Sequence, residues 1–388
     1  MAKFDFNNSR YARLFSDSDV RFLQTYIDNA AMLEVNHGWW MTQFKKADQV
    51  TPTADDGTAT FTVKARKLEV APLMDIRDRL GDSMPLDNKG VAFYSATVPD
   101  FIAPGIVEKA PERYSKEQMF EEFGNDRDIL LAWTQKLQER YDSANSTLTY
   151  MGAKLMSEGK IFYDGGRGAH LPLHKANIPA DNFKNAGAVV WTDTVNCKLI
   201  DQMAKIEDDW RNATGYTGPL VWKIPLNMFR TCFKPNAQVR QWIIDSVKVN
   251  NDPITANFVY DDNTVLQFLA KNDTISPIEL VVEKERKLNL ETDTMVHGWK
   301  QNIAVLCPAG YVGEIQYTDQ LEIKLAKKYG SSIVTKNFAS LQQGLAWVIA
   351  TTLNNGNYKE WHTDLIMSAV PSLTEFPYHV IVDTTTAD

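Results

Sequence analysis

The chain has few cysteines, no excess of basic residues and no long hydrophobic run among its 388 residues. Its three cysteines, Cys197, Cys232 and Cys307, are far apart and form no CxxC pair, which argues against a disulfide framework and against a zinc site. The net charge of -8 argues against a general nucleic-acid binder. No run of about 18 apolar residues occurs, so the sequence predicts neither a membrane-spanning segment nor a membrane partner.

The sequence motifs of common enzymes are also missing. There is no HExxH, no GxSxG, no Walker A sequence and no GxGxxG after a predicted strand. His170 and His174 are four residues apart but fall on a predicted strand, so we expect no metal pair there. Cys307 and His297 are candidates for the nucleophile and base of a soluble hydrolase, although a buried structural thiol is the favoured interpretation. We therefore expect a protein that is not an enzyme, with no cofactor and no metal.

One long, one-sided helix is the most prominent feature that the chain does contain. It is predicted over 125–159, with Asn125 as N-cap and Gly159 as the stop. At 1.5 Å per residue it would be roughly 50 Å long. Its apolar positions recur every three or four residues, which is one stripe along a helix: Leu130, Trp133, Leu137, Tyr141, Ala144, Leu148, Met151 and Leu155.

The segment before this helix has apolar residues but too few to build a core of its own. Residues 16–31 predict a short helix, and Trp39 and Trp40 form an apolar cluster. Residues 58–65 and 91–98 alternate as two strands of a ribbon, which is marginal alone in water. The polar stretch 75–90 between them forms a charged tip. We expect the arm and the ribbon to cover neighbouring copies of the same chain, in a large heterologous assembly.

The segment after the helix predicts a hairpin and then a compact α/β unit. The hairpin strands are 160–163 and 169–174, and a further strand is predicted at 187–191. The α/β unit, from about residue 196, should contain helices at 196–215, 226–233 and 236–247 and strands at 220–224, 265–270, 278–283 and 303–306. A helix over 338–350 and a final strand over 378–384 complete the prediction. A short helix is also expected from Ser115, where a capping box occurs.

In this order of elements the chain resembles the major capsid proteins of tailed phages, in particular those of the phage lambda type. The resemblance rests on several stretches. Residues 61–72, which end in Glu69-Val70-Ala71-Pro72, are similar to the strand that leads into the E-loop, 78–90 to its tip and 98–110 to its exit. Residues 125–159 resemble the spine helix, and Gly159-Lys160-Ile161-Phe162-Tyr163 the hairpin that follows. Residues 187–191 and the helix that runs to Trp210 resemble the entry into the axial domain. The end of the family's chain is similar to Pro308-Ala309-Gly310 and to the last strand, 377–384.

The resemblance implies an α+β fold of the Hong Kong 97-like phage capsid type. Its parts would be an N-terminal arm at 1–56, an E-loop at 57–110, a P-domain with the spine helix at 111–192 and an A-domain at 193–335. The C-terminal segment, 336–388, would return to the P-domain and A-domain. The implied function is that of a virion structural protein, without catalysis, which self-assembles as hexamers and pentamers into an icosahedral shell around double-stranded DNA.

The resemblance also implies partners and a place in the cell. Because only 124 residues precede the spine helix and these are already assigned to arm and loop, we expect the scaffolding protein to be separate. A portal is expected, and a decoration protein stays open. The acidic balance implies weak contact with packaged DNA. Assembly would take place in the bacterial host cytoplasm.

Contacts between copies are expected at the charged tip and at the tryptophan pair: Arg77, Asp78, Arg79, Asp82, Lys89, Trp39 and Trp40. Charge pairs of this kind give specificity more than affinity. Lys89 is also the one reasonable donor for the lysine–asparagine cross-link of some relatives, which we do not expect here. Two alternatives stay open, which are a nanocompartment shell of the encapsulin type with the same fold, and the soluble hydrolase that uses Cys307 and His297.

Overall fold

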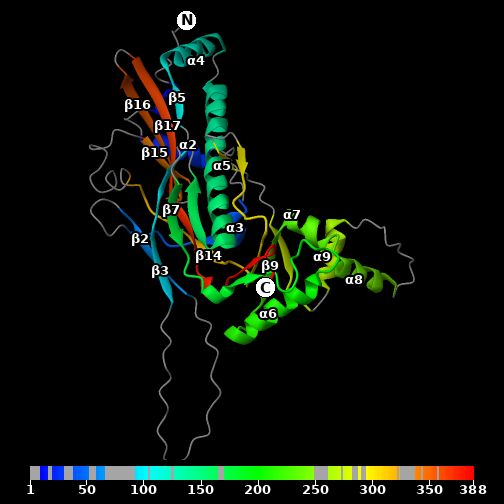
Figure 1. Cartoon of the computed structure of the whole chain (residues 1–388). Coiled ribbons are helices and arrows are strands. Elements are labelled where there is room, and N and C mark those ends of the chain that lie inside the picture. Colours follow the sequence, from blue (N-terminus) through cyan, green and yellow to red (C-terminus); the bar gives the residue numbers. More distant parts are fainter. Residues whose placement is uncertain are drawn as a thin grey trace, which may run out of the picture.

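A computed structural model gives the arrangement of the chain. It describes residues 9–15, 20–29, 38–51, 58–65, 92–103, 105–123, 126–164, 170–248, 261–271, 274–281, 287–289, 294–320, 323, 337–341, 344–355 and 358–388. Figure 1 shows the long helix α5 standing beside one sheet, with α6 to α9 gathered around another at its lower end. Among the described helices, none combines the length and the apolar character that crossing a bilayer requires.

The long helix is confirmed as α5, Asp126–Glu158. Its predicted stripe is buried, from Leu130 and Trp133 to Met151 and Leu155. The helix ends where Gly159 takes a φ of 69° and donates its N–H to the carbonyl of Leu155 at 2.9 Å. A side chain would be strained in that left-handed conformation, which is why glycine stops the helix here.

The seven-stranded sheet packs on one face of α5 (Figure 1). Its main strand is β17, Tyr358–Leu373, which pairs antiparallel with β16, β14, β4 and β5. The bounds of the other strands are Ala346–Asn355 for β16, Gly313–Tyr317 for β14, Asp100–Ile102 for β4, Ile106–Glu108 for β5, Asn337–Leu341 for β15 and Phe44–Lys46 for β1. Trp133 of α5 donates its indole N–H to Thr363 Oγ1 of β17 at 3.0 Å, which ties the helix to the sheet.

Three short antiparallel pairs lie outside the two larger sheets. The ribbon pairs β2, Thr60–Lys64, with β3, Phe93–Thr97. The predicted hairpin after α5 is confirmed as β6, Lys160–Asp164, with β7, His170–Lys175. The third pair is β11, Lys287–Asn289, with β12, Thr294–Val296.

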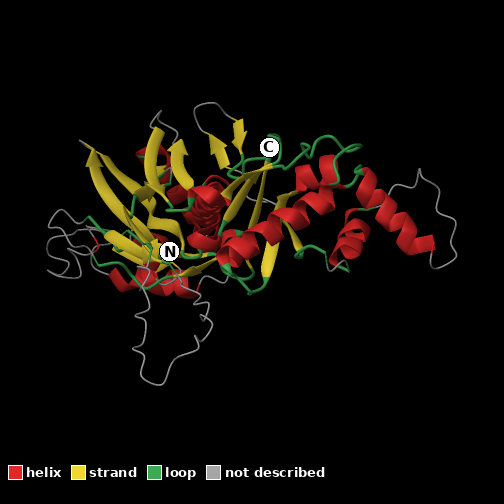
Figure 2. Cartoon of the chain, turned by 60° about the horizontal axis from the view of Figure 1, so that its bottom comes forward, coloured by secondary structure: helices red, strands yellow, loops and turns green. Residues whose placement is uncertain are grey.

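The five-stranded sheet has the order β10, β9, β13, β18, β8. Its strands are Ile278–Val281, Leu220–Pro225, Ile303–Pro308, Val380–Asp383 and Phe183–Asn185 in that order. The helices on this side are α6, Leu199–Thr214, α7, Leu226–Met228, which continues as a π-turn over Phe229–Phe233, α8, Ala237–Lys248, and α9, Asp262–Ala270. Figure 2 shows this helix-rich end on the right, away from the strand-rich end.

Two hydrophobic cores lie on either side of the five-stranded sheet. The alternation along β13 divides them, since Ile303, Val305 and Cys307 belong to the core around α5, whereas Ala304 and Leu306 belong to the core under α6 and α8. β13 is buried along its whole length. A strand buried on both faces reads as a continuous apolar run, as this one does.

The first three described helices lie on the chain's own body. They are α1, Arg10–Arg13, α2, Val20–Asn29, and α3, Trp40–Gln43. The apolar side chains of this segment enter the core around α5: Tyr11, Leu14, Phe15, Leu23, Ile27, Trp40 and Phe44. Gly152 of α5 makes room for Phe44, because an added Cβ would lie 2.8 Å from Phe44 Cε2. For the described part of 1–56, the expectation that the arm cannot be buried within its own chain is therefore wrong.

Two predicted elements have the wrong type. Residues 265–270 are the end of helix α9, not a strand, because Asp261 caps the helix by accepting the N–H of Thr264 at 2.8 Å. Where a helix was predicted over 338–350, residues 338–341 belong to β15 and 346–350 to β16, and the two strands pair antiparallel in the seven-stranded sheet. There the β-branched Val348 and Ile349 are buried between neighbours, and tertiary pairing overrides the helical period.

Two further predictions are displaced in the sequence. No strand forms at 187–191; the strand of this region is β8, four residues earlier, where it pairs parallel with β18. The helix expected from Ser115 is α4, Ala110–Phe123, which begins five residues earlier. The carboxylate of Glu112 accepts the N–H of Lys109 at 3.1 Å, so the capping interaction comes from Glu112.

Candidate assembly surfaces

The helix α1 is anchored to the rest of the subunit by a buried polar cluster. Tyr11 donates its hydroxyl to the carboxylate of Glu108 at the end of β5. Lys116 of α4 also binds Glu108, and its Nζ lies 3.1 Å from the Tyr11 hydroxyl. Burial, together with the charge of Glu108, raises the pKa of Tyr11, so the phenol stays protonated and remains a donor. The cluster joins the N-terminal segment, β5 and α4 in one place.

Aromatic stacking extends this anchor along β17. Phe15 stacks on Trp361 with ring centroids 4.6 Å apart, and the guanidinium of Arg113 lies 4.2 Å from the centre of the same indole. Such ring pairs and cation–π contacts each add roughly 1 kcal/mol beyond the buried area. Segments that precede α5 thus cover this end of β17.

The tryptophan pair lies within the subunit. Trp40 is buried, and its indole N–H donates to Asn145 Oδ1 of α5 at 3.2 Å. Trp39 is half-buried, with its ring 6.3 Å from that of Trp299. With 4% of its surface exposed, Trp40 has almost no side-chain area left for a neighbouring copy. The structure therefore makes Trp40 a core residue, and only Trp39 keeps surface for the predicted contact.

The base of the ribbon is fixed to the same core. Phe61 and Val63 of β2 and Tyr94 of β3 are buried. The Tyr94 hydroxyl accepts the N–H of Leu373 at 2.9 Å and lies 3.3 Å from the Leu373 carbonyl, to which it donates. Its ring stacks on His174 at 5.9 Å, and both ring nitrogens of His174 are inaccessible to solvent. Burial lowers the pKa of His174 to about 4.

Exposed apolar side chains follow the chain from the ribbon to α4. They are Phe93, Ile102, Val107, Tyr114 and Met119, with exposed fractions of 63%, 66%, 39%, 62% and 50%. Phe93, Ile102 and Val107 point outward from β3, β4 and β5, because alternate residues of these strands face the core. We name these five residues the exposed apolar row. Their exposure leaves these side chains available for contact with another molecule.

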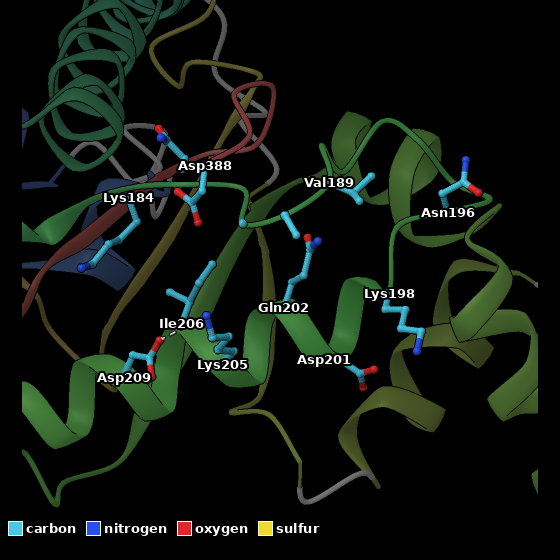
Figure 3. A pocket seen from close by; sticks show the side chains of 13 residues that line it. Lys184, Val189, Asn196, Lys198, Asp201, Gln202, Lys205, Ile206, Asp209 and Asp388 are labelled. Carbon is cyan, nitrogen blue, oxygen red and sulfur yellow. Dashed lines mark ion pairs between the residues drawn. The ribbon is translucent and has the colours of Figure 1, made fainter.

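A pocket of about 480 Å³ lies between α6 and the segment after β8. Figure 3 shows Gln202 and Ile206 pointing from α6 toward that segment. The charged side chains that line the pocket are three lysines and three aspartates: Lys184, Lys198, Lys205, Asp201, Asp209 and Asp388. The side chains that line it include no serine, cysteine or histidine, so they offer no Ser–His or Cys–His pair.

Cys307 cannot serve as a nucleophile. It is fully buried in β13, and burial raises the pKa of its thiol to about 12, so almost no thiolate exists near neutral pH. His297, the base expected to act with it, is exposed and lies directly after β12. The burial of Cys307 and the exposure of His297 thus argue against the hydrolase alternative. No group of three His, Cys, Asp or Glu side chains with metal-binding geometry occurs in the part of the chain that the structure describes.

The charged tip lies outside the described residues. This applies to Arg77, Asp78, Arg79, Asp82 and Lys89, whose expected contacts with other copies stay a prediction. Sequence reasoning missed the exposed apolar row, although one signal was available. Tyr114 and Met119 stand on a helix whose few apolar residues are separated by charged ones and form no stripe. This pattern is typical of a helix that has no core of its own to cover.

The chain was compared with protein families, curated proteins and solved structures. No family profile and no curated protein matches it. A prophage protein of E. coli CFT073, assigned to the capsid, is 10% identical; the match covers 94% of this chain and 98% of that one, with a TM-score of 0.52. This likeness shows the fold, and the predicted Hong Kong 97-like capsid fold is confirmed.

Two other solved structures match at lower TM-scores. The capsid of Ralstonia phage GP4 is 13% identical, with coverage of 90% and 92% of the two chains and a TM-score of 0.38. A virus-like particle from Pyrococcus furiosus is 8% identical, with coverage of 90% and 94% and a TM-score of 0.36. The assignment of the fold rests on the prophage protein alone.

Proposed function

We propose that this chain is the major capsid protein of a tailed phage, which self-assembles as hexamers and pentamers into an icosahedral shell around double-stranded DNA. The observation that carries the proposal is the match to the prophage capsid protein over nearly the full length of both chains. The exposed apolar row is available for contacts between copies, as the proposal requires. A separate scaffolding protein, a portal and weak contact with DNA, in a shell assembled in the host cytoplasm, belong to the same proposal.

Within this proposal each part of the chain has its own role in the subunit or in the contacts between subunits. The arm at 1–56 locks the subunit, and the E-loop at 57–110 and the P-domain at 111–192 carry the contacts to other copies. The A-domain at 193–335 contains the helices of the second core, and 336–388 returns through both sheets. Burial of the exposed apolar row between copies would stabilise the assembly by about 25 cal/mol per Å².

The test is to express the chain alone and with the scaffolding protein from its own gene neighbourhood, and to examine both by gel filtration and negative-stain electron microscopy. We expect capsomers, tubes or spheres of megadalton size. A discrete species of 43.9 kDa under both conditions would contradict the proposal. Particles that enclose a protein cargo in place of nuclease-protected DNA would instead favour the nanocompartment.

Charge reversal at the ribbon tip tests the contacts proposed there. Arg77→Glu with Arg79→Glu should abolish closed particles but leave the subunit folded, because like charges would then face each other across the contact. Particle yield by sedimentation and folding by circular dichroism check this. Lys205→Glu with Lys271→Glu, two exposed positions, changes the net charge equally and should leave the yield unchanged. Closed particles from the Arg77 and Arg79 variant would contradict the proposed role.

A further inference from the structure

The ribbon, β2 with β3, is attached to the rest of the subunit through side chains. In the described part of the chain its two strands pair with each other and with no strand of the two larger sheets. Its buried side chains are Phe61, Val63 and Tyr94. Of these only Tyr94 carries a polar group, which forms two hydrogen bonds with the backbone of Leu373. Separation of the ribbon at its base would therefore leave the described strand pairing of both larger sheets intact.

The base of the ribbon rests on His174 of β7. The imidazole stacks on the Tyr94 ring with centroids 5.9 Å apart and meets the Phe61 ring edge to face at 6.1 Å. Tyr94 in turn contacts Phe376 edge to face, at 5.3 Å. One imidazole thus contacts an aromatic ring from each strand of the ribbon.

Neither nitrogen of this imidazole has a hydrogen-bond partner. Both are shielded from solvent, although His174 as a whole is half-buried. A neutral imidazole has one N–H donor and one acceptor nitrogen, and both are left unsatisfied here. A phenyl ring would fill the same place without that cost. The histidine therefore weakens a contact that apolar packing alone would make, and it brings a group that protons can charge into that contact.

No charged neighbour compensates a proton on His174. The other titratable residues on the elements packed here, besides Tyr94, are Lys64 of β2, Lys160, Tyr163 and Asp164 of β6, His170 and Lys175 of β7, and Glu375 beside Phe376. No hydrogen bond joins any described one of them to the ring. Burial raises the pKa of Tyr94, so its hydroxyl stays protonated, and burial lowers the pKa of His174 to about 4.

Protonation would place a charge and a second unsatisfied donor between the ribbon and the hairpin. A stacked imidazolium gains a cation–π contact with Tyr94. The lowered pKa of His174 means that the loss of hydration outweighs this gain. The charge reaches water when the ribbon moves off β7, and neither of the larger sheets has to open for that. Release of the ribbon therefore lets His174 take up a proton without unfolding the subunit.

We propose that His174 is a proton-operated lock between the ribbon and the β6–β7 hairpin. The neutral ring holds the base of the ribbon on the subunit, and the protonated ring releases it while both larger sheets stay folded. The E-loop would then change its orientation with pH. The relevance of this change to shell assembly rests on the proposed function, whereas the lock itself does not.

The test is amide hydrogen exchange of Leu373 in the full-length chain at pH 7 and pH 5, corrected for the intrinsic rates. The Tyr94 hydroxyl accepts this N–H at 2.9 Å, so the amide becomes free when the ribbon leaves. With a pKa of about 4 in the docked state and about 6.5 in the released state, linkage makes release about twentyfold more frequent at pH 5. Exchange of Leu373 should rise by that factor.

Denaturant distinguishes local release from unfolding of the whole subunit. Exchange of Leu373 should not depend on low concentrations of denaturant, because local opening exposes little surface. The N–H of Trp222, which donates to the Pro277 carbonyl at 2.8 Å beside the second core, should show the strong dependence of global unfolding.

Three variants assign the effect to His174. His174→Phe should abolish the pH dependence and slow the exchange of Leu373 at pH 7. His379→Gln is the matched control, because burial also lowers the pKa of His379 to about 4 but its ring binds Met156 and not the ribbon; the twentyfold rise should remain. Tyr94→Phe, which removes the hydroxyl, should make exchange fast at both pH values. Cooperative melting of each variant at pH 7 establishes that it is folded.

Three results would overturn the lock. The first is exchange at Leu373 that does not change between pH 7 and pH 5. The second is a rise with the same denaturant dependence as Trp222, because the whole subunit then opens. The third is a rise that persists in His174→Phe or disappears in His379→Gln. A wild type that builds no shell but shows the Leu373 effect refutes the proposed function and leaves the lock intact.

Discussion

The two hydrophobic cores are assembled in different ways from the same chain. The core under α6 and α8 draws on 186–306 and on the final strand. The core around α5 collects side chains from both ends of the chain, from Tyr11 to Ile381. It depends on bonds between distant residues, such as Tyr94 to Leu373, 279 positions apart. One core is therefore built mostly from neighbouring segments, and the other needs the whole chain.

The five-stranded sheet is the wall that the two cores share. Along β18, Ile381 faces the core around α5, and Val380 and Val382 face the other. His379, just before β18, places its Nε2 2.6 Å from the carbonyl of Met156 at the end of α5. If either core unfolds, one face of this sheet loses the side chains that pack on it. The comparison thus predicts that the two unfold together, despite their different construction.

Removal of one large side chain from each core is the strongest test of that coupling. Trp133→Ala and Trp222→Ala, both at fully buried positions, should each lower the free energy of unfolding by about 3–5 kcal/mol. Calorimetry should show one transition, displaced downward in both variants. Thr363→Val, which removes only the partner of the Trp133 indole, should cost about 1 kcal/mol. Two separate transitions, with only one displaced in each variant, would show that the cores are independent.

Acid should weaken the core around α5 through two histidines. Burial lowers the pKa of His174 to about 4. Burial, with a smaller contribution from the charge of Lys223, lowers the pKa of His379 to about 4, although the hydrogen bond to Met156 acts in the opposite direction. The unfolded chain binds these protons near pH 6.5, before the folded chain does, so stability falls as the pH drops from about 6.5 to about 4. By linkage each histidine should cost about 2 kcal/mol at pH 5 relative to pH 7.

His174→Phe separates the contribution of one histidine from the rest. The ring would keep its packing on Tyr94 and Phe61, and both buried nitrogens without a hydrogen bond would be gone. Denaturant melts at pH 7 and pH 5 should show a pH dependence smaller by about 2 kcal/mol in this variant. His379→Gln keeps a donor for Met156 and should reduce the dependence by a similar amount. An unchanged pH dependence in both variants would contradict the assignment.

Helix caps give the smallest expected effect and compare the two regions at the level of single turns. Asp261 caps α9 beside the second core, and Ser9 caps α1 by accepting the N–H of Ala12 at 3.1 Å. Asp261→Ala and Ser9→Ala should each lower the free energy of unfolding by about 1 kcal/mol. Chemical denaturation checks both values. A much larger loss for Ser9→Ala, whose side chain is buried, would show that the cap also holds the N-terminal segment in place.

The elements that the sequence predicted well are those whose pattern is long and local. The helix α5 runs over about nine turns at 3.6 residues per turn and carries one regular apolar stripe, so its bounds were predicted within one residue. The α6 helix and its glycine stop at Gly215, and the strands at 220–224 and 303–306, carry equally local signals. The apolar run at 265–270 was misleading because a run this short fits a helix as well as a strand, and only the cap at Asp261 distinguishes the two.

The surfaces could not be predicted in the same way. The arm was expected to need other copies because the sequence does not show that Asn145 and Trp361 lie next to Trp40 and Phe15 in space. For the same reason 338–350 was assigned to a helix, since the pairing of β15 with β16 and of β16 with β17 is visible only in the sheet. Contacts between distant residues, and between copies, leave little periodic trace in one sequence.

The position of β18 has a consequence for how the protein is made. This strand lies between β13 and β8 in the five-stranded sheet, yet its residues, 380–383, are synthesised more than 70 positions after those of β13. Before β18 is synthesised, one side of β13 has no partner strand, and the sheet between the two cores lacks one of its inner strands. A nascent chain therefore cannot complete the wall between the two cores until β18 has been synthesised, so neither core can be finished while the chain still lacks this strand.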